Sequence, residues 1–205
     1  MPPVGISTRA LGGVRIVYVN RPGKGNALDL ETTRGLLRQL REFEKNDAVQ
    51  MVYLMGGDRR VFSTGTEMEG LMGKADGGDR NALEALRLEY VLQWLVHTYS
   101  KPLVVGMEGL SAGSGLGLGL NSRFGYATES SRFVVPEVSA GLVPTGGATY
   151  YLSRTRSGVG AYAALSGLEV SGRIAFLSGL VPYWGSETAL RRQGPWLSQA
   201  LSADL

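Results

Sequence analysis

KPLVVGMEGLSAGSGLGLGL, residues 101–120, joins a short apolar run to a segment in which glycine recurs at almost every second position. The apolar run at 101–107 has the length and composition of a buried strand. The glycine-rich part at 109–120 follows this strand and is predicted to begin a helix. Backbone N–H groups at such a junction can hold an anion or a developing oxyanion. The stretch therefore predicts a fold element and a candidate site together.

Two other interpretations of these glycines stay open. A dinucleotide-binding fingerprint has the pattern GxGxxG, but the pattern counted from Gly113 meets Leu118 at its last place. The stretch also lies in the middle of the chain rather than in a first βαβ unit. The other interpretation is structural, a glycine-rich helix that packs closely on a sheet. The stretch alone does not decide between a packing helix and an anion site.

The segments on both sides of this stretch alternate between strand and helix patterns, which predicts a layered α/β fold. Apolar runs predict strands at 14–19, 49–55 and 123–128. At 61–71 a strand end passes through Gly65 and leads into a short helix. From about residue 146 the chain is predicted to form mostly short helices. We find no repeat and no linker, so we expect a single domain over residues 1–205.

Two longer helices are predicted from the spacing of apolar residues. Asp29 can cap the first helix, whose apolar face carries Leu36, Leu37, Leu40 and Phe43. The second helix covers residues 81–99, and we expect its inward face to carry Leu83, Leu86, Tyr90 and Trp94.

The composition excludes several classes of protein and site. Of the 205 residues 43% are hydrophobic and 19% charged, which is ordinary for a globular protein. No run of 18 apolar residues exists, so no membrane-spanning helix is expected. Cysteine is absent, which excludes disulfides and thiolate chemistry. His97 is the only histidine, which excludes a histidine-based metal site, and we expect neither a metal nor a cofactor.

The basic residues are unusual in kind rather than in number. The net charge of +3 is too small to indicate a nucleic-acid binder, but 17 of the 21 basic residues are arginine. Arginine suits phosphate contacts and interface ion pairs, but a GC-rich genome is the preferred explanation of the bias. Residues 1–28 carry Arg9, Arg15, Arg21 and Lys24 without an acid, as the end of a mitochondrial targeting segment would. The strand predicted at 14–19 weakens that interpretation.

Four segments in series resemble the successive signatures of the crotonase superfamily, which contains enoyl-CoA hydratases, isomerases and acyl-CoA hydrolases. The segments are NRPGKGNAL (20–28), VFSTGTEME (61–69), the stretch at 101–120, and FVVPEVSAGLVPTGGATYYLSR (133–154). The resemblance covers about residues 8–183 and is strongest to the 3-hydroxyisobutyryl-CoA hydrolase branch. It implies a spiral of ββα units, usually assembled into trimers through C-terminal helices. Residues 184–205 supply only a short helical tail, so we expect that either the trimerisation region is missing or shortened or the sequence is a trimmed piece of a longer protein.

The resemblance also implies roles for particular residues. Backbone N–H groups at the positions of Thr66 and Ser114 polarise the thioester carbonyl as an oxyanion hole. Glu89 matches a substrate-contacting glutamate, and Glu137 matches the catalytic glutamate of the hydrolase branch. Thr145 stands where that branch has a partner aspartate. Ser114 replaces a glycine, which adds a Cβ where acyl-CoA passes and adds strain if its φ is positive.

These departures shape the expected function. Gly117 stands where hydratases have their first glutamate, so the chain cannot be a two-glutamate hydratase. The hydroxyl of Thr145 cannot act as an acid or base near pH 7. We therefore expect a protein with a degraded catalytic site that serves as a structural subunit of a larger mitochondrial assembly. The alternatives are an active CoA-thioester hydrolase and a one-glutamate enoyl-CoA isomerase.

The expected partners follow from the same resemblance. Crotonase-fold proteins similar to the hydrolase occur as subunits of mitochondrial ribosomes, so ribosomal proteins and RNA are candidate partners. We expect protein contacts through the C-terminal third, no family-type trimer and no membrane association. Acyl-CoA is the expected ligand if the chain is active.

Overall fold

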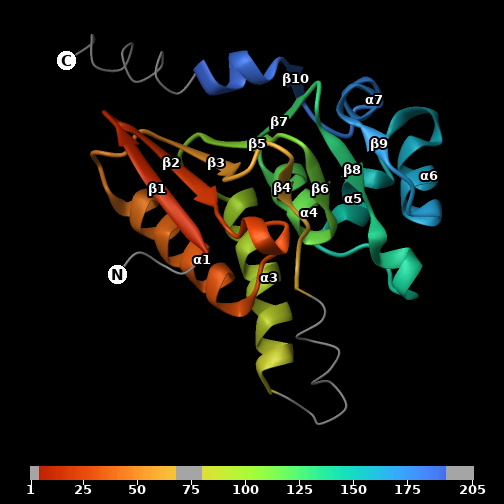
Figure 1. The fold of residues 1–205 in the computed structure, drawn as a ribbon, viewed down its shortest axis with the longest axis horizontal. Coiled ribbons are helices and arrows are strands. Elements are labelled where there is room, and N and C mark those ends of the chain that lie inside the picture. Colours follow the sequence, from red (N-terminus) through yellow and green to blue (C-terminus); the bar gives the residue numbers. More distant parts are fainter. Residues whose placement is uncertain (1–4, 68–79, 193–205) are drawn as a thin grey trace.

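A six-stranded sheet forms the larger layer of the molecule (Figure 1). The computed structural model describes residues 5–67 and 80–192. The strands of this sheet, in spatial order, are β1 (Ile6–Leu11), β2 (Val14–Val19), β3 (Met51–Gly56), β5 (Leu103–Met107), β7 (Phe124–Thr128) and β10 (Tyr183–Gly185). β1 pairs antiparallel with β2, and every other pairing in the sheet is parallel. The strands predicted at 14–19, 49–55, 101–107 and 123–128 are confirmed.

A smaller second sheet contains three strands that each come directly after a strand of the large sheet in the sequence, and a fourth strand that comes later. Its spatial order is β4 (Val61–Ser63), β6 (Leu110–Ala112), β8 (Arg132–Val134) and β9 (Val170–Ser171). β3 leads into β4, β5 into β6, and β7 into β8, so the chain repeatedly crosses from the large sheet to the small one. After β6 the chain continues directly into helix α4 (Gly113–Asn121). This is the ββα spiral that the sequence motifs implied.

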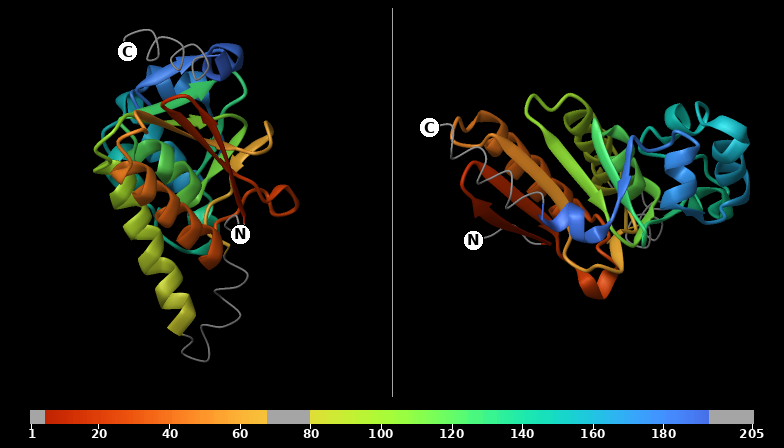
Figure 2. Two further views of the ribbon diagram at one scale, coloured as in Figure 1. Left: turned by 90° about the vertical axis from the view of Figure 1, so that its left-hand side faces the viewer. Right: turned by 90° about the horizontal axis from the view of Figure 1, so that it is seen from above.

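Helices α1 (Leu30–Lys45), α3 (Arg80–His97) and α4 pack against the large sheet (Figure 1). Shorter helices follow β8 and form a group at the far end of the molecule (Figure 2, right). They are η2 (Pro136–Ala140), α5 (Ala148–Leu152), η3 (Arg156–Gly158), α6 (Val159–Ser166) and α7 (Gly172–Leu177). The short helices expected after residue 146 are thus confirmed, whereas the strands β1, β6, β8, β9 and β10 were not predicted. Among the residues that the structure describes, none of the helices could cross a bilayer.

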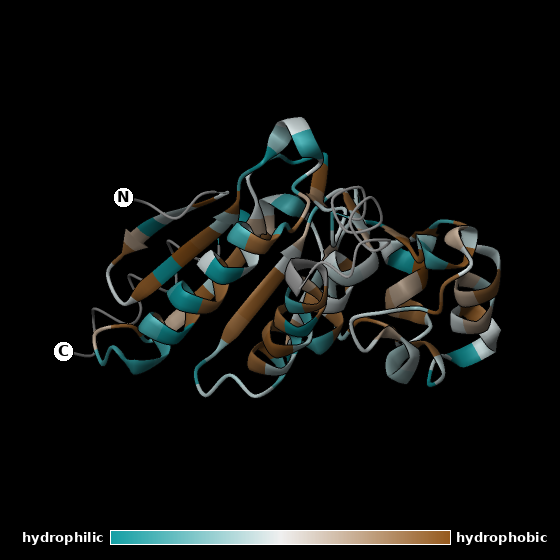
Figure 3. Cartoon of the chain, turned by 90° about the horizontal axis from the view of Figure 1, so that it is seen from below, coloured by the Kyte–Doolittle hydropathy of each residue, from teal (hydrophilic) through white to brown (hydrophobic). Residues whose placement is uncertain are grey.

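The cap and the apolar face of α1 agree with the sequence. The Asp29 carboxylate accepts a hydrogen bond from the Thr32 backbone N–H at 2.7 Å, which satisfies one of the free donors at the helix start. Leu36, Leu37, Leu40 and Phe43 are all buried. In Figure 3 the strands behind the helices are predominantly hydrophobic, while hydrophilic residues lie on the outer turns.

The predicted inner face of α3 is wrong. Leu83, Leu86, Tyr90 and Trp94 are 71%, 37%, 53% and 62% exposed. The buried residues of this helix are Glu89, Leu92, Gln93, Leu95 and Val96. The helix carries two apolar stripes, and the prediction chose the one without polar residues. The stripe beside the buried glutamate and glutamine faces the core because these two polar groups find hydrogen-bond partners there.

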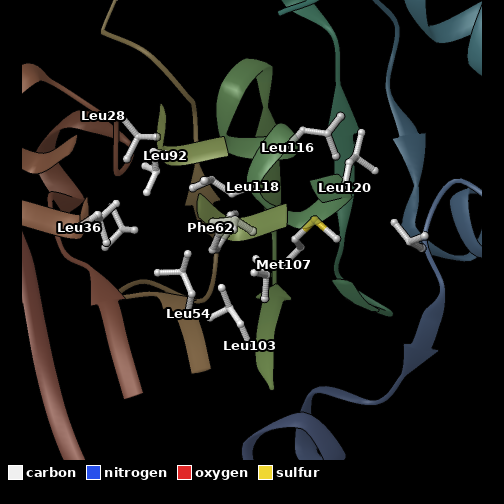
Figure 4. Close-up of a cluster of buried hydrophobic side chains, with 14 of the residues drawn as sticks. Leu28, Leu36, Leu54, Phe62, Leu92, Leu103, Met107, Leu116, Leu118 and Leu120 are labelled. Atoms are coloured by element: carbon white, nitrogen blue, oxygen red, sulfur yellow. The ribbon is translucent and has the colours of Figure 1, made fainter. Parts of the chain in front are cut away.

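The glycines of α4 allow this helix to pack closely in the centre of the core (Figure 4). A Cβ added to Gly115 would lie 2.6 Å from the Ser63 carbonyl oxygen, and one added to Gly119 would lie 2.0 Å from the Met107 sulfur. Leu116 and Leu118 fill the space between the helix and its neighbours. The structural interpretation of the glycine run is therefore correct for its middle and end.

The basic residues near the N-terminus belong to the folded domain. Arg9 lies on β1 and Arg15 on β2, within the antiparallel hairpin at the edge of the large sheet. Residues 6–19 therefore form part of the large sheet. The short helix expected within 61–71 extends beyond residue 67 and lies outside the described residues.

Candidate active site

The candidate site lies where the loop after β4 meets the start of α4. Gly65 in that loop has φ +82°, and a Cβ there would lie 2.7 Å from the Ala112 carbonyl oxygen and 2.8 Å from the Ser114 nitrogen. Only a glycine permits both this φ and this approach. Gly65 therefore brings Thr66 beside the first turn of α4.

Three of the predicted site residues are joined by hydrogen bonds. The Thr66 hydroxyl donates a hydrogen bond to Oε2 of Glu89, which lies in the middle of α3. Thr66 Oγ1 and Ser114 Oγ lie 2.8 Å apart. Because the Thr66 proton is directed to Glu89, Ser114 is the donor of this second bond. Two consecutive hydrogen bonds thus connect Ser114 through Thr66 to the Glu89 carboxylate. Ser114, the first donor of this series, is 1% exposed.

The backbone N–H groups of Thr66 and Ser114 have the freedom that an oxyanion hole requires. Leu28 donates to the Gly65 carbonyl at 2.7 Å and accepts from the Glu67 N–H at 3.2 Å, so the N–H of Thr66 points away from this pairing. Ser114 lies in the first turn of α4, where N–H groups have no intrahelical acceptor. Positive φ occurs at Gly113, at +51°, and not at Ser114, so the condition for strain at Ser114 is not met.

Glu137 reaches the same region from the other side. It lies in η2, which begins at Pro136 directly after β8 and ends at Gly141 in a left-handed conformation. The Thr145 N–H and hydroxyl both donate to Glu137 Oε1, at 3.0 and 2.9 Å. The same oxygen lies 3.6 Å from the position of a Cβ built on Gly113. The structure therefore brings Glu137 and Thr145 to the start of α4.

Burial raises the pKa of Glu89, and the carboxylate of Glu137 lies close enough to influence it. Removal from water raises the pKa of Glu89, the hydrogen bond from Thr66 opposes this rise, and the negative charge of Glu137 adds to it. Glu89 Oε1 and Glu137 Oε2 are buried, and neither has a hydrogen-bond partner among the described residues. The site thus holds two neighbouring carboxylates, each with one unused acceptor oxygen.

Sequence reasoning missed two residues that hold the site together. Gln93 Nε2 donates to the Ser114 carbonyl at 2.8 Å, and Gln93 Oε1 accepts from Asn121 Nδ2 at 3.1 Å. Asn121 Nδ2 also lies 2.8 Å from the carbonyl oxygens of Gly117 and Gly146. Glu89 and Gln93 are one helical turn apart, and this i, i+4 polar pair was the available signal.

Two further positions are informative. A Cβ on Gly117 would lie 2.8 Å from the Gly146 carbonyl oxygen, so a glutamate side chain does not fit where hydratases have their first one. His97 is exposed at the end of α3, with its Nδ1 3.5 Å from the Tyr151 hydroxyl. Among the described residues no cluster of acidic or histidine side chains could hold a metal ion.

Known proteins show the family to which this arrangement belongs. Residues 14–202 match the enoyl-CoA hydratase/isomerase family. A probable 3-hydroxyisobutyryl-CoA hydrolase of Arabidopsis thaliana is 34% identical over 177 residues, 86% of this chain and 47% of that protein. The mitochondrial 3-hydroxyisobutyryl-CoA hydrolase of Danio rerio is 31% identical over 80% of this chain and 43% of that protein. The small ribosomal subunit protein mS47 of Neurospora crassa is 30% identical over 92% of this chain and 38% of that protein.

Solved structures confirm the fold. An enoyl-CoA hydratase from Rhodobacter sphaeroides superposes with a TM-score of 0.88 at 25% identity, over 96% of this chain and 58% of that one. A carnitinyl-CoA dehydratase from Mycobacterium thermoresistibile also has a TM-score of 0.88, at 27% identity, over 97% of this chain and 60% of that one.

The chain spans less than half the length of these three curated relatives. The relatives that are named mitochondrial indicate a mitochondrial location. With the ββα spiral, the α4 junction and these matches together, the chain belongs to the enoyl-CoA hydratase/isomerase family, the crotonase superfamily, and is similar within it to the 3-hydroxyisobutyryl-CoA hydrolases.

Proposed function

We propose that this chain is a 3-hydroxyisobutyryl-CoA hydrolase-like protein with a degraded catalytic site, and that it serves as a structural subunit of a larger mitochondrial assembly such as the mitochondrial ribosome. The observation that carries this proposal is the buried hydroxyl of Ser114, which is bound to Thr66 at the place where a thioester carbonyl would enter.

The Ser114 hydroxyl competes with a substrate for this place. Thioester hydrolysis needs donors directed at the oxygen that becomes negative, and here these are the N–H groups of Thr66 and Ser114. The side chains of the same two residues hydrogen-bond to each other and to Glu89. A carbonyl that enters must displace a side chain that is 1% exposed and already satisfied. Substrate binding is therefore opposed by the native hydrogen-bond network.

Thr145 weakens the chemistry in a second way. Its N–H and hydroxyl position Glu137 Oε1, but neither group can deliver a proton to a leaving thiolate near pH 7. The loss of one acid–base partner lowers a rate by about 10²–10⁴-fold. Glu137 is thus held in place without a second ionisable group on the Thr145 side.

A role in an assembly is supported by the similarity to a ribosomal protein and by exposed apolar side chains. The ribosomal relative from Neurospora crassa aligns with 92% of this chain. The C-terminal third exposes large apolar side chains, and apolar surface of this kind marks interaction sites where it is extensive. These side chains are Leu142, Val143, Tyr150, Tyr162, Leu165, Leu168, Ile174, Phe176, Leu177, Tyr183 and Trp184.

An active thioester hydrolase is the second candidate. The specific observation in its favour is the pair of buried, unpartnered oxygens on Glu89 and Glu137. Buried polar atoms are nearly always hydrogen-bonded, so unpartnered oxygens on two neighbouring carboxylates suit a site that awaits a ligand.

Two measurements on the full chain separate the candidates. Tagged chain expressed in mitochondria should sediment with the small ribosomal subunit, and purified chain should hydrolyse 3-hydroxyisobutyryl-CoA no faster than the uncatalysed control. Turnover at an ordinary enzymatic rate of about 1–10³ s⁻¹ would contradict the proposal, provided that Glu137→Gln abolishes it. Glu169→Gln, a change at an exposed glutamate paired with Arg132, is the matched control.

A further inference from the structure

The face of the large sheet opposite to α1 and α3 carries a second apolar cluster. Side chains alternate along a strand, so Ile16 of β2 points away from the side on which Val17 joins the main core. Ile16 pairs in register with Tyr53 of β3, and both belong to this second cluster. The helical residues 187–192 cover part of the cluster through Leu190, which is 1% exposed. This face therefore has a small core of its own.

A cavity of about 190 Å³ lies beside Leu190 on this face. Pockets for drug-sized ligands measure about 300–1,000 Å³, so this cavity suits a smaller molecule. Leu11, Ile16 and Met55 line it with apolar surface, and two arginines and two tyrosines line the rest. No acidic residue stands among the described residues of the lining. The cavity thus offers a small ligand both apolar contact and hydrogen-bond donors.

Tyr53 brings a hydroxyl without a partner to this lining. The residue is 1% exposed, and its hydroxyl oxygen is buried with no hydrogen-bond partner among the described residues. Burial raises the pKa of Tyr53 to about 12, so the hydroxyl keeps its proton near pH 7 and remains a donor. Since buried polar groups are nearly always hydrogen-bonded, this donor suits an acceptor that a ligand supplies.

Arg191 is held in one orientation before any ligand arrives. Its Nε–H donates to Oε1 of Glu108 at 2.8 Å, and its Nη2 donates to Oε2 of the same carboxylate. Glu108 follows β5 directly and is 2% exposed, so the anchor is buried. These two bonds use Nε and Nη2, which leaves the donors on Nη1 for another acceptor. A guanidinium that is already fixed loses little conformational freedom when a ligand binds.

Arg9 supplies the charge that the described chain leaves uncompensated at the cavity. It is exposed on β1 and pairs with Ile16 in the β1–β2 register. Within residues 5–67 and 80–192 Arg9 has no ion-pair partner, whereas Arg191 is neutralised by Glu108. A single positive charge matches a carboxylate better than a phosphate group, which carries about two negative charges.

We propose that this cavity binds the carboxylate of a small amphipathic molecule. Arg9, Arg191 and Tyr53 donate hydrogen bonds to the carboxylate oxygens, which together accept several such bonds. The apolar body of the ligand packs on Leu11 and Met55. None of the lining residues belongs to the candidate active site, so the proposal does not depend on the function proposed above.

A titration of the full chain with isobutyrate tests the proposal. This probe joins one carboxylate to a branched apolar body, and ligand-observed NMR measures its affinity. We expect a Kd on the order of 1 mM, because so small a ligand makes few contacts. Arg9→Gln should weaken binding about tenfold, since it removes a charge-assisted hydrogen bond, and Tyr53→Phe about fivefold, since it removes a neutral one.

A stability measurement separates a binding role of Tyr53 from a structural one. In the ligand-free chain Tyr53→Phe should not lower the urea midpoint, because the lost hydroxyl has no partner there. Tyr99→Phe should lower the midpoint, because the Tyr99 hydroxyl donates to the Leu40 carbonyl at 2.7 Å, and should leave the isobutyrate affinity unchanged. Arg41→Gln, at an exposed arginine of α1, is the charge-matched control for Arg9→Gln and should also leave the affinity unchanged.

Three further probes test the chemistry of the ligand. Isobutyramide has the same shape without the charge, acetate has the charge without the branched body, and inorganic phosphate is a different anion. Each should bind at least about fivefold more weakly than isobutyrate. The proposal is overturned if isobutyrate does not bind, if either Arg9→Gln or Tyr53→Phe binds it as the unmodified chain does, or if any of the three probes binds equally well.

Discussion

The two faces of α3 are both mixed in character, since the inner face buries Leu92, Leu95 and Val96 together with two polar residues and the outer face exposes apolar side chains. The inner face buries Glu89 and Gln93 among hydrogen-bond partners, while the outer face exposes Leu83, Tyr90 and Trp94 to solvent. A helix that serves only a core has its apolar side inward. The comparison teaches that the inner face combines core packing with the candidate site, because Glu89 and Gln93 find hydrogen-bond partners there.

The largest effect is expected from restoring the family's residues at the inner site. Ser114→Gly with Thr145→Asp should raise thioester hydrolysis by about 10²–10⁴-fold over the unmodified chain. The glycine removes the competing hydroxyl, and the aspartate supplies an ionisable partner to Glu137. Single changes should recover little because both obstacles act on one transition state. The measurement is hydrolysis of 3-hydroxyisobutyryl-CoA, and activity that survives Glu137→Gln would refute this explanation.

A second comparison contrasts truncation on the two faces. Leu92→Ala on the inner face should lower the free energy of unfolding by about 2–5 kcal/mol, because Leu92 is 0% exposed and its removal leaves a cavity. Leu83→Ala on the outer face should change it by less than about 0.5 kcal/mol. Urea denaturation of both variants gives the two values. Similar losses at the two positions would show that the outer face is covered in the isolated chain.

A smaller loss is expected from the buried polar group beside Leu92. Gln93→Ala removes the hydrogen bonds to the Ser114 carbonyl and to Asn121, and should cost about 1–3 kcal/mol. Trp94→Ala, one residue further along, should cost less than about 0.5 kcal/mol. Equal stability of the Gln93 variant and the unmodified chain would mean that water replaces the glutamine without loss.

The smallest effect concerns the pH dependence of stability. Burial raises the pKa of Glu89 in the folded chain, so the folded state binds more protons than the unfolded state between the two pKa values. The contribution of Glu89 is therefore fully present below its unfolded pKa and is lost as pH rises through the folded pKa. Glu89→Gln should flatten this part of the stability profile. Parallel profiles for the variant and the unmodified chain from pH 4 upward, a range that begins at about the unfolded pKa of glutamate, would contradict the prediction.

Local signals were sufficient for much of the fold. The strands at 14–19 and 123–128, the Asp29 cap and the helix that begins at Gly113 all depend on neighbouring residues, and all are present. The edge strand β1 was missed because its sequence, ISTRAL, has one buried residue and a mostly exposed pattern. A strand of this kind is recognisable only from its pairing with β2.

The site was predictable in its members but not in its connections. Motif resemblance placed Thr66, Glu89, Ser114, Glu137 and Thr145 together, and the structure brings them to the start of α4. It did not reveal that the Ser114 hydroxyl binds Thr66, nor that Gln93 and Asn121 support α4. These contacts join residues between 21 and 48 positions apart, so no local pattern encodes them.

The sequence by itself determined the main strands and the two long helices, the glycine spacing that permits α4 to pack, and the acids and hydroxyls available to the site. Only the tertiary structure decided which stripe of α3 is buried. Both stripes have helical spacing, and the difference lies in partners on other elements, Thr66 for Glu89 and the Ser114 carbonyl for Gln93. Burial of a polar group is favourable only where such partners are present, and their positions are set by the packing of the whole chain.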